Sequence, residues 1–115
     1  MPETIFTKII RKEIPADIVY ETDTVLAFRD IRPQAPTHIL IIPKIEIPTV
    51  TEIKGREHAA ILGDLFDAVN VIAKKENLVE KGFRVVINCG PDGGQEVYHL
   101  HLHLMGGRKF SWPAG

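Results

Sequence analysis

The feature that most constrains how this chain can fold is a strictly alternating run of histidine and leucine near the C-terminus. Residues 98–104 read Tyr-His-Leu-His-Leu-His-Leu and hold three of the five histidines. Successive side chains of a β-strand point to opposite faces of a sheet, so this period of two predicts a strand over Val97–Met105. The expected core face consists of Tyr98, Leu100, Leu102 and Leu104. The other face carries His99, His101 and His103, about 6.6 to 6.8 Å apart along the strand.

Three aligned imidazoles indicate a catalytic or binding role, because they are costly to bury and contribute little as packing groups. The glycine-rich segment Cys89–Gln95 directly precedes them. Glycines allow turns with positive φ, which bring successive backbone N–H groups close to an anion. A nucleophilic imidazole beside anion-binding amides suits group transfer at phosphorus. The sequence has no GxxxxGK[ST] run, which excludes the usual P-loop route to phosphates.

Zinc is the main alternative to a nucleophilic histidine. A His-x-His pair on a strand can place two imidazole nitrogens on one metal, and His38 could add a third from a neighbouring strand. Cys89 is the only thiol, however, and no CxxC or HExxH element completes a site. We therefore expect no metal and no cofactor, with a three-histidine zinc site as the lesser alternative.

The rest of the chain predicts a single α+β domain over residues 1–115. Apolar residues at three- and four-residue steps predict one long helix, from about Gly55 to Asn77. Its expected buried stripe is Leu62, Leu65, Phe66, Val69, Ile72 and Ala73. Thr4 is positioned to cap a short first helix that reaches Ile10. The remaining strands are expected at Ile18–Glu21, Val25–Arg29, His38–Ile42 and Phe83–Asn88. Five strands in this order favour a mostly antiparallel sheet.

Composition narrows the classes of partner. The chain of 115 residues has a net charge of −1, whereas a protein that grips nucleic acid through its phosphates is usually basic. A lone cysteine favours a reducing compartment. The longest aliphatic run, Ile39–Ile42, is far shorter than the roughly 20 residues of a membrane-spanning helix. The first residues also lack a signal-peptide pattern. We expect a cytoplasmic protein that binds neither nucleic acid nor membrane.

The run His99–Met105 matches the His-φ-His-φ-His-φ-φ signature of the histidine triad (HIT) superfamily, where φ is apolar. Four further segments, Thr4–Pro15, Ala27–His38, Gly93–Gln95 and Gly106–Pro113, resemble its Hint branch of nucleotide-binding proteins, in the bacterial form. The resemblance covers nearly the whole chain. It implies a five-stranded antiparallel sheet with one short and one long helix. It also implies a homodimer whose two sheets join into one of ten strands.

The resemblance implies hydrolysis of purine nucleoside 5′-phosphoramidates and aminoacyl-type adenylates, without a metal. His101 would be the nucleophile that becomes nucleotidylated, and the His99 carbonyl would fix its tautomer. His103 would contact the phosphate or the leaving group, with support from His38. The transferase branch replaces the third histidine, so the presence of His103 favours hydrolysis. A dinucleoside polyphosphate hydrolase and a nucleotide-binding regulator remain alternatives.

Nucleotide contacts also follow from the resemblance. Asn88, with the backbone of Gly94 and Gln95, would hold the phosphate oxygens, and Asp30 would accept the ribose hydroxyls. The implied base slot is Ile5, Phe6, Ile9, Phe28, Ile31 and Leu40. Considered alone, Asp30 is an ordinary turn residue and the six apolar residues are ordinary core. Glu96 stands where animal Hint proteins carry serine, so it either favours cationic leaving groups or is a solvated surface residue.

Overall fold

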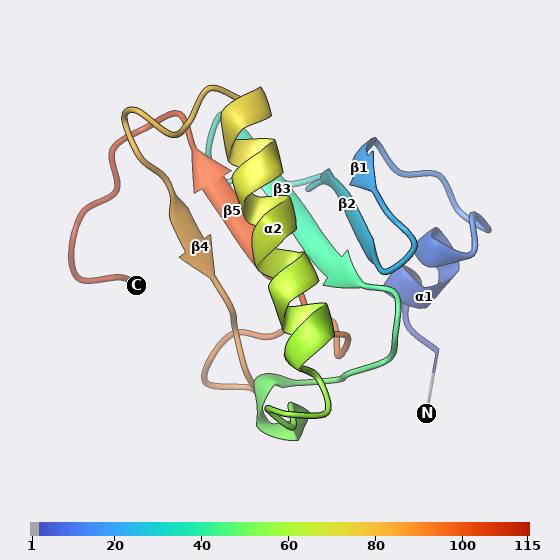
Figure 1. The fold of residues 1–115 in the computed structure, drawn as a ribbon. Helices are drawn as coiled ribbons and strands as arrows, with labels where there is room; N and C mark the ends of the chain where they lie inside the picture. Colours follow the sequence, from blue (N-terminus) through green and yellow to red (C-terminus); the bar gives the residue numbers. More distant parts are fainter. Residues whose placement is uncertain (1–2) are drawn as a thin grey trace.

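The computed structural model describes residues 3–115, and its centre is one five-stranded antiparallel sheet (Figure 1). The elements in chain order are α1 (Ile5–Ile10), β1 (Ile18–Glu21), β2 (Val25–Arg29), β3 (Thr37–Pro43), the 3-10 turn η1 (Val50–Glu52), α2 (Ala59–Lys75), β4 (Arg84–Val86) and β5 (Leu102–Gly106). The strand order β1-β2-β3-β5-β4 places β3 and β5 side by side in the interior of the sheet. The predicted α+β class is therefore confirmed. Among the described residues, no helix has the length and hydropathy of a membrane span.

The first three elements form as the local sequence predicts. The Thr4 hydroxyl accepts the backbone N–H groups of Phe6 and Thr7, at 3.2 and 3.3 Å, and so caps α1. Strands β1 and β2 have the predicted bounds and pair antiparallel. Thr22 tightens the turn between them by accepting the Val25 N–H at 3.1 Å.

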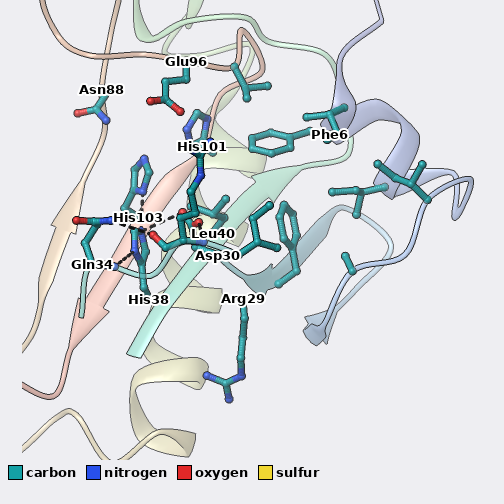
Figure 2. Close-up of a pocket in the computed structure, with 18 of the residues that line it drawn as sticks. Phe6, Arg29, Asp30, Gln34, His38, Leu40, Asn88, Glu96, His101 and His103 are labelled. Atoms are coloured by element: carbon teal, nitrogen blue, oxygen red, sulfur yellow. Dashed lines mark hydrogen bonds and ion pairs between the residues drawn. The ribbon is translucent and has the colours of Figure 1, made fainter. Parts of the chain in front are cut away.

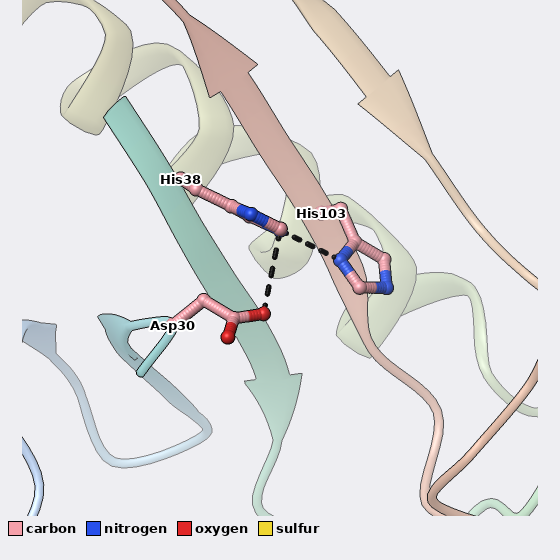
Figure 3. A group of neighbouring side chains, drawn as sticks. All are labelled: Asp30, His38 and His103. Carbon is pink, nitrogen blue, oxygen red and sulfur yellow. Dashed lines mark hydrogen bonds and ion pairs between the residues drawn. The ribbon is translucent and has the colours of Figure 1, made fainter. Parts of the chain in front are cut away.

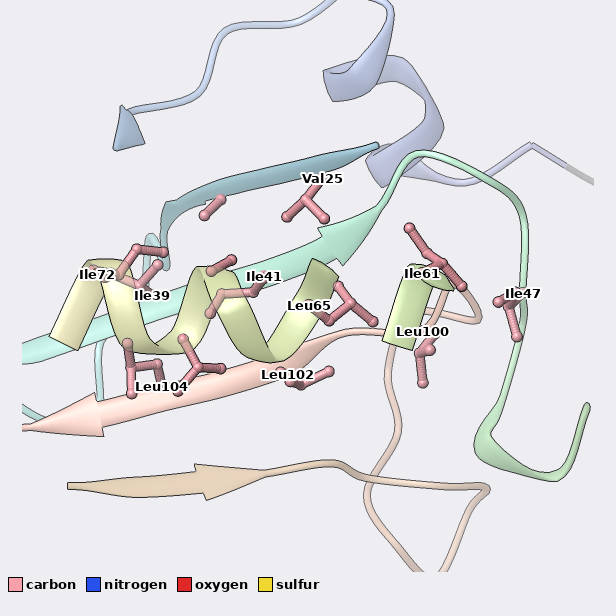
Figure 4. Packing of buried hydrophobic residues seen from close by; sticks show 13 residues of the cluster. Val25, Ile39, Ile41, Ile47, Ile61, Leu65, Ile72, Leu100, Leu102 and Leu104 are labelled. Atoms are coloured by element: carbon pink, nitrogen blue, oxygen red, sulfur yellow. The ribbon is translucent and has the colours of Figure 1, made fainter. Parts of the chain in front are cut away.

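One face of the sheet is closed by α2 (Figure 4). The helix buries Ile61, Leu65, Ala68, Val69, Ile72 and Ala73. These pack on Leu100, Leu102, Leu104 and the inward residues of β2 and β3. The predicted stripe was wrong at Phe66, whose residue is 48% exposed. The helix also begins at Ala59, because residues 55–58 form turns.

The opposite face is covered by α1. Phe6 and Ile9 of this six-residue helix pack against Leu26, Phe28, Leu40 and Ile42. These sheet residues alternate with those under α2, as the pleat requires. So short a helix covers only part of its face, and the uncovered part is where two of the alternating histidines emerge.

The predicted strand Val97–Met105 was wrong in its first half, since β5 begins at Leu102. Antiparallel pairing places Ile41 opposite Leu102, so two residues further along the ladder Leu100 would lie opposite Pro43. Proline has no N–H to donate, and the ladder stops there. The Leu100 N–H instead reaches the Ile47 carbonyl at 2.6 Å. Outside the strand, Tyr98 is 44% exposed and is not a core residue.

Strand β4 is likewise shorter than predicted, because it ends at Val86 rather than Asn88. Asn88 therefore lies in the connection that follows the strand. This connection carries its side chain to the cavity described next.

Candidate active site

A cavity of about 490 Å³ opens on the α1 face of the sheet (Figure 2). Most of the residues expected to bind a nucleotide line it. They are Ile5, Phe6, Ile9, Phe28, Asp30, Ile31, His38, Leu40, Asn88, Gly94, Glu96, His101 and His103. Two expected residues, His99 and Gln95, are not among its lining residues. The cavity has an apolar end around α1 and a polar end around the histidines.

His101 presents an unprotonated ring nitrogen. Its Nδ1 lies 2.8 Å from the His99 carbonyl oxygen, which can only accept a hydrogen bond. The ring proton of neutral His101 therefore sits on Nδ1, and Nε2 carries a lone pair. Burial lowers the pKa of His101, which keeps the imidazole neutral near pH 7. The Phe6 ring stands perpendicular to the His101 ring, with centroids 5.0 Å apart, and packs against it from the α1 side.

His99 contributes its backbone rather than its ring. The ring does not line the cavity and donates Nε2–H to the Pro43 carbonyl at 2.8 Å. This bond uses the acceptor at which the β3–β5 ladder stops. It anchors the irregular segment before β5, whose carbonyl then orients His101.

His38 and His103 form a hydrogen-bonded pair across β3 and β5. The Gln34 backbone N–H donates to His38 Nδ1 at 3.0 Å, which leaves the His38 proton on Nε2. That Nε2–H donates to His103 Nδ1 at 2.9 Å. The remaining His103 nitrogen, Nε2, is buried and has no hydrogen-bond partner among residues 3–115. Burial, with help from the neighbouring His101 and His38, lowers the pKa of His103 to about 4.

Asp30 lies beside this pair, directly after β2 (Figure 3). Its Oδ1 accepts the Arg32 N–H at 2.8 Å, and its Oδ2 lies 3.5 Å from His38 Nε2. Ligand atoms of Asp30, His38 and His103 come within 4.8 Å of one another, a spacing that could hold a metal ion. The proton positions oppose this use, because His38 Nε2 carries a proton for as long as Gln34 donates to Nδ1. The three donors do not fit a zinc ion.

The glycine-rich loop is held from behind by Gln95. The buried Gln95 side chain accepts the Gly90 N–H at 3.0 Å and donates to the Pro48 and Val97 carbonyls at 2.8 and 3.0 Å. The backbone N–H groups expected to hold phosphate are used within the loop. That of Gly94 donates to the Pro91 carbonyl, and that of Gln95 to the Gly90 carbonyl. These bonds hold the loop in one conformation. The polar side chain of Asn88, just before the loop, lines the cavity.

Some lining residues were not predicted from the sequence. Ile14, Pro15 and Ala16, between α1 and β1, extend the apolar end of the cavity. Their apolar character just after a short amphipathic helix was the available signal. Gln34 was also missed, since its contribution is a backbone N–H that no residue type reveals.

The comparisons with known proteins agree with this geometry. Residues 11–110 match the HIT domain family, and the chain belongs to that family. It is similar to a protein of Escherichia coli strain K12 named purine nucleoside phosphoramidase, with 58% identity over 92% of this chain and 88% of that one. A maize protein named 14 kDa zinc-binding protein is 59% identical over 97% of this chain and 88% of that one.

Solved structures show the same fold. A HIT family hydrolase from Legionella pneumophila superposes with a TM-score of 0.95 at 49% identity. The superposition covers 98% of this chain and 100% of that chain. The sheet and both helices are therefore those of the HIT family.

Proposed function

We propose that this protein hydrolyses purine nucleoside 5′-phosphoramidates through a nucleotidyl-histidine intermediate. The observation that carries the proposal is that one cavity is lined by both His101 and His103, each with its Nε2 unbonded among the described residues. His101 Nε2 offers a lone pair, and His103 Nε2 offers an N–H without an acceptor. A nucleophile beside a hydrogen-bond donor is what displacement at a phosphoryl group requires. The similarity to the E. coli phosphoramidase supports the same reaction.

The reaction would proceed by two displacements. In the first, the His101 Nε2 lone pair attacks the α-phosphorus, the P–N bond breaks, and the amine leaves with a proton from water. The His101 ring keeps its Nδ1 proton, so it becomes positively charged, and the His99 carbonyl stabilises that charge at 2.8 Å. In the second, water attacks phosphorus, the Nε2–P bond breaks and the nucleoside 5′-monophosphate is released. The proton lost by this water neutralises the hydroxide that the first step left.

The cavity supports one orientation of the nucleotide. Its apolar end, formed by Phe6, Ile9, Phe28 and their neighbours, suits the flat face of a purine. Asp30 lines the same cavity, and its Oδ2, which lies 3.5 Å from His38 Nε2, can accept the ribose hydroxyls. The α-phosphate then meets Asn88, His101 and His103. We assign phosphate binding to these side chains rather than to the amides of Gly94 and Gln95, which the loop already uses.

Glu96 would select among leaving groups. Its carboxylate lies at the polar end of the cavity, between Asn88 and His101 (Figure 2). A negative charge there favours amines that carry a second, positive group and disfavours acidic ones. Glu96→Ser and Glu96→Gln each remove this charge. In both variants we expect the ratio of kcat/KM for a diamine to kcat/KM for an uncharged amine to fall about tenfold, the effect of one partly solvated charge. An unchanged ratio of kcat/KM values would contradict this role.

The decisive test is release of AMP from adenosine 5′-phosphoramidate by the wild type and by His101→Ala, in the presence of EDTA. We expect turnover by the wild type alone. AMP binding without turnover by the wild type would instead indicate a nucleotide-binding regulator. Loss of wild-type activity on adding EDTA would indicate a metal.

Zinc binding, the property named for the maize relative, is not part of this proposal. The donor set nearest to a metal site is Asp30, His38 and His103. His38 could serve as a ligand through Nε2 only by moving its proton to Nδ1, where it would oppose the Gln34 N–H at 3.0 Å. The proposed chemistry uses these residues as donors and acceptors of hydrogen bonds.

We also propose that two copies associate through β4 and α2, as the family resemblance implies. β4 is an edge strand, so its outer hydrogen-bonding groups can pair with a second β4. Phe66 on α2 and Ile87 after β4 are exposed apolar residues of these elements. Light scattering is expected to give a dimer mass for the wild type and a monomer mass for Phe66→Asp. Ile18→Asp, on the other edge strand, is expected to stay dimeric.

A further inference from the structure

His38 and His103 each have one ring proton to place, because burial keeps both imidazoles neutral near pH 7. The placement decides what His103 presents to the cavity. With His38 protonated on Nε2, His103 accepts at Nδ1 and presents Nε2–H. With His38 protonated on Nδ1, the bond between the rings reverses, and His103 presents a lone pair. The distance of 2.9 Å between His38 Nε2 and His103 Nδ1 fits both arrangements.

Two neighbours of His38 select the first arrangement. The Gln34 backbone N–H, 3.0 Å from His38 Nδ1, can only donate, so Nδ1 must accept. The Asp30 carboxylate, 3.5 Å from His38 Nε2, can only accept, which favours a proton on Nε2. Both contacts therefore act in the same direction from opposite sides of the ring.

We propose that the Gln34 backbone amide is a positioning group that, through His38, holds His103 as a hydrogen-bond donor toward the substrate. The inference rests on the proposed function for the identity of the substrate group. Phosphoryl oxygens and a departing amine nitrogen both accept hydrogen bonds, so His103 Nε2–H stabilises the displacement. A lone pair at the same position would repel them.

A contact outside the cavity holds the backbone of Gln34 on its carbonyl side. The Gln34 carbonyl accepts Arg108 Nε–H at 3.1 Å. The Arg108 guanidinium in turn lies 4.2 Å from the centroid of the Phe110 ring. Arg84 packs against the same ring, at 5.0 Å, but bonds to the Ser111 carbonyl instead of Gln34. A residue beyond β5 is thus bonded to the same loop residue whose N–H reaches His38.

The test replaces the Gln34 amide by an ester, which exchanges the N–H for an oxygen lone pair without adding bulk. Nitrogen NMR of labelled histidines reads the proton positions in the resting protein. In the wild type we expect protons on Nε2 of His38 and His103. In the ester variant we expect them on Nδ1 of both, with turnover lowered at least about tenfold, because a donor to the reacting group is lost. Adenosine, which lacks the phosphate, is expected to bind within about threefold of the wild type.

Two side-chain variants serve as controls. Gln34→Ala keeps the backbone amide and is expected to keep the proton pattern of the wild type. Arg108→Gln is expected to lower turnover about threefold by loosening the loop, whereas Arg84→Gln leaves it unchanged.

A proton on His103 Nδ1 in the wild type would overturn the proposal, as would an ester variant with unchanged proton positions and turnover. If the ester variant does not fold, the wild-type spectrum decides alone. If the wild type shows the expected proton pattern but no phosphoramidase activity, the proposed function fails and the proton placement stands. The two failures are therefore distinguishable.

Discussion

The two faces of the central sheet are made from the same strands and serve different purposes. Under α2, Ile39, Ile41, Leu102 and Leu104 form a closed aliphatic layer beneath a helix of 17 residues. On the other face, His38, Leu40, His101 and His103 lie beside a helix of six residues. The long helix excludes water completely, whereas the short one leaves a cavity. A single alternating strand can therefore place the residues that stabilise the fold on one face of the sheet and the reactive residues on the other.

The same separation explains how histidines are tolerated in the interior. Each ring that borders or underlies the cavity is paired with a group of known polarity: a carbonyl for His99 and His101, an amide for His38 and a ring nitrogen for His103. Buried polar groups are acceptable when they are paired. Among residues 3–115, His103 Nε2 is the one fully buried side-chain nitrogen or oxygen without a partner, and His103 lines the cavity.

Shortening a side chain under α2 is the strongest test of whether the two faces act independently. Leu102→Ala removes a fully buried side chain and is expected to lower the free energy of unfolding by about 2–5 kcal/mol. The turnover of the folded protein should stay within about twofold, since Leu102 faces away from the cavity. Urea denaturation and steady-state kinetics on the same preparation measure both. A loss of turnover in fully folded protein would show that the faces are coupled.

The adjacent residue on the same strand should give the reverse result. His103→Ala removes the donor that faces the substrate, and kcat is expected to fall about 10²–10³-fold. Its free energy of unfolding should change by less than about 1 kcal/mol, because a desolvated polar ring is lost as well as its contacts. His103→Gln, which can still donate from a side-chain amide, is the matched variant and should recover part of the lost rate.

The histidine face should make stability depend on pH. Burial lowers the pKa of His38, His99 and His101, and that of His103 to about 4. The unfolded chain, with histidine pKa values near 6.5, then binds more protons than the native protein between about pH 6.5 and 5. Stability is therefore retained above about pH 6.5 and falls as the pH is lowered, by up to about 1.4 kcal/mol per pH unit for each histidine. Urea denaturation at pH 7, 6 and 5 measures this slope, which His103→Gln should reduce.

The smallest effect is expected at an ion pair that joins the central sheet to α2. Arg29 at the end of β2 pairs through two nitrogens, at 3.1 Å each, with Glu76 at the end of α2. Glu76→Gln is expected to lower the free energy of unfolding by about 1 kcal/mol, since the pair is partly exposed. Arg29 also precedes Asp30, so a raised KM with unchanged kcat would show that the pair helps to place the ribose site.

Most of the fold could be predicted because local sequence and tertiary structure agree. The Thr4 cap and the two strands of the first hairpin formed within the predicted bounds. The errors arose where tertiary contacts override the pattern. Alternation continues through Tyr98, yet no strand forms there, because Pro43 ends the partner ladder. Phe66 has the right spacing for the core but lies on the outer side of α2.

The candidate site was predictable in composition and less so in the role of each group. The alternation predicted that His99, His101 and His103 would line one face, and the structure places His101 and His103, but not His99, in the cavity. It could not show that the His99 ring turns inward, or that the amides of Gly94 and Gln95 are used within their own loop. The positions of protons on His38 and His103 depend on a backbone N–H, which the identity of residue 34 does not encode.

Gly106, the last residue of β5, has a consequence for the whole arrangement. A Cβ at this position would lie 2.6 Å from Leu78 Cδ2, so the side chain of Leu78 occupies a notch that only glycine leaves open. Gly106 also lies opposite Thr37 in the ladder in which Leu40 lies opposite His103. A slip of one residue would place the histidines beneath α2 and the leucines in the cavity. A residue without a side chain at the far end of the strand thus leaves the space that Leu78 fills, and Leu78 itself does not line the cavity.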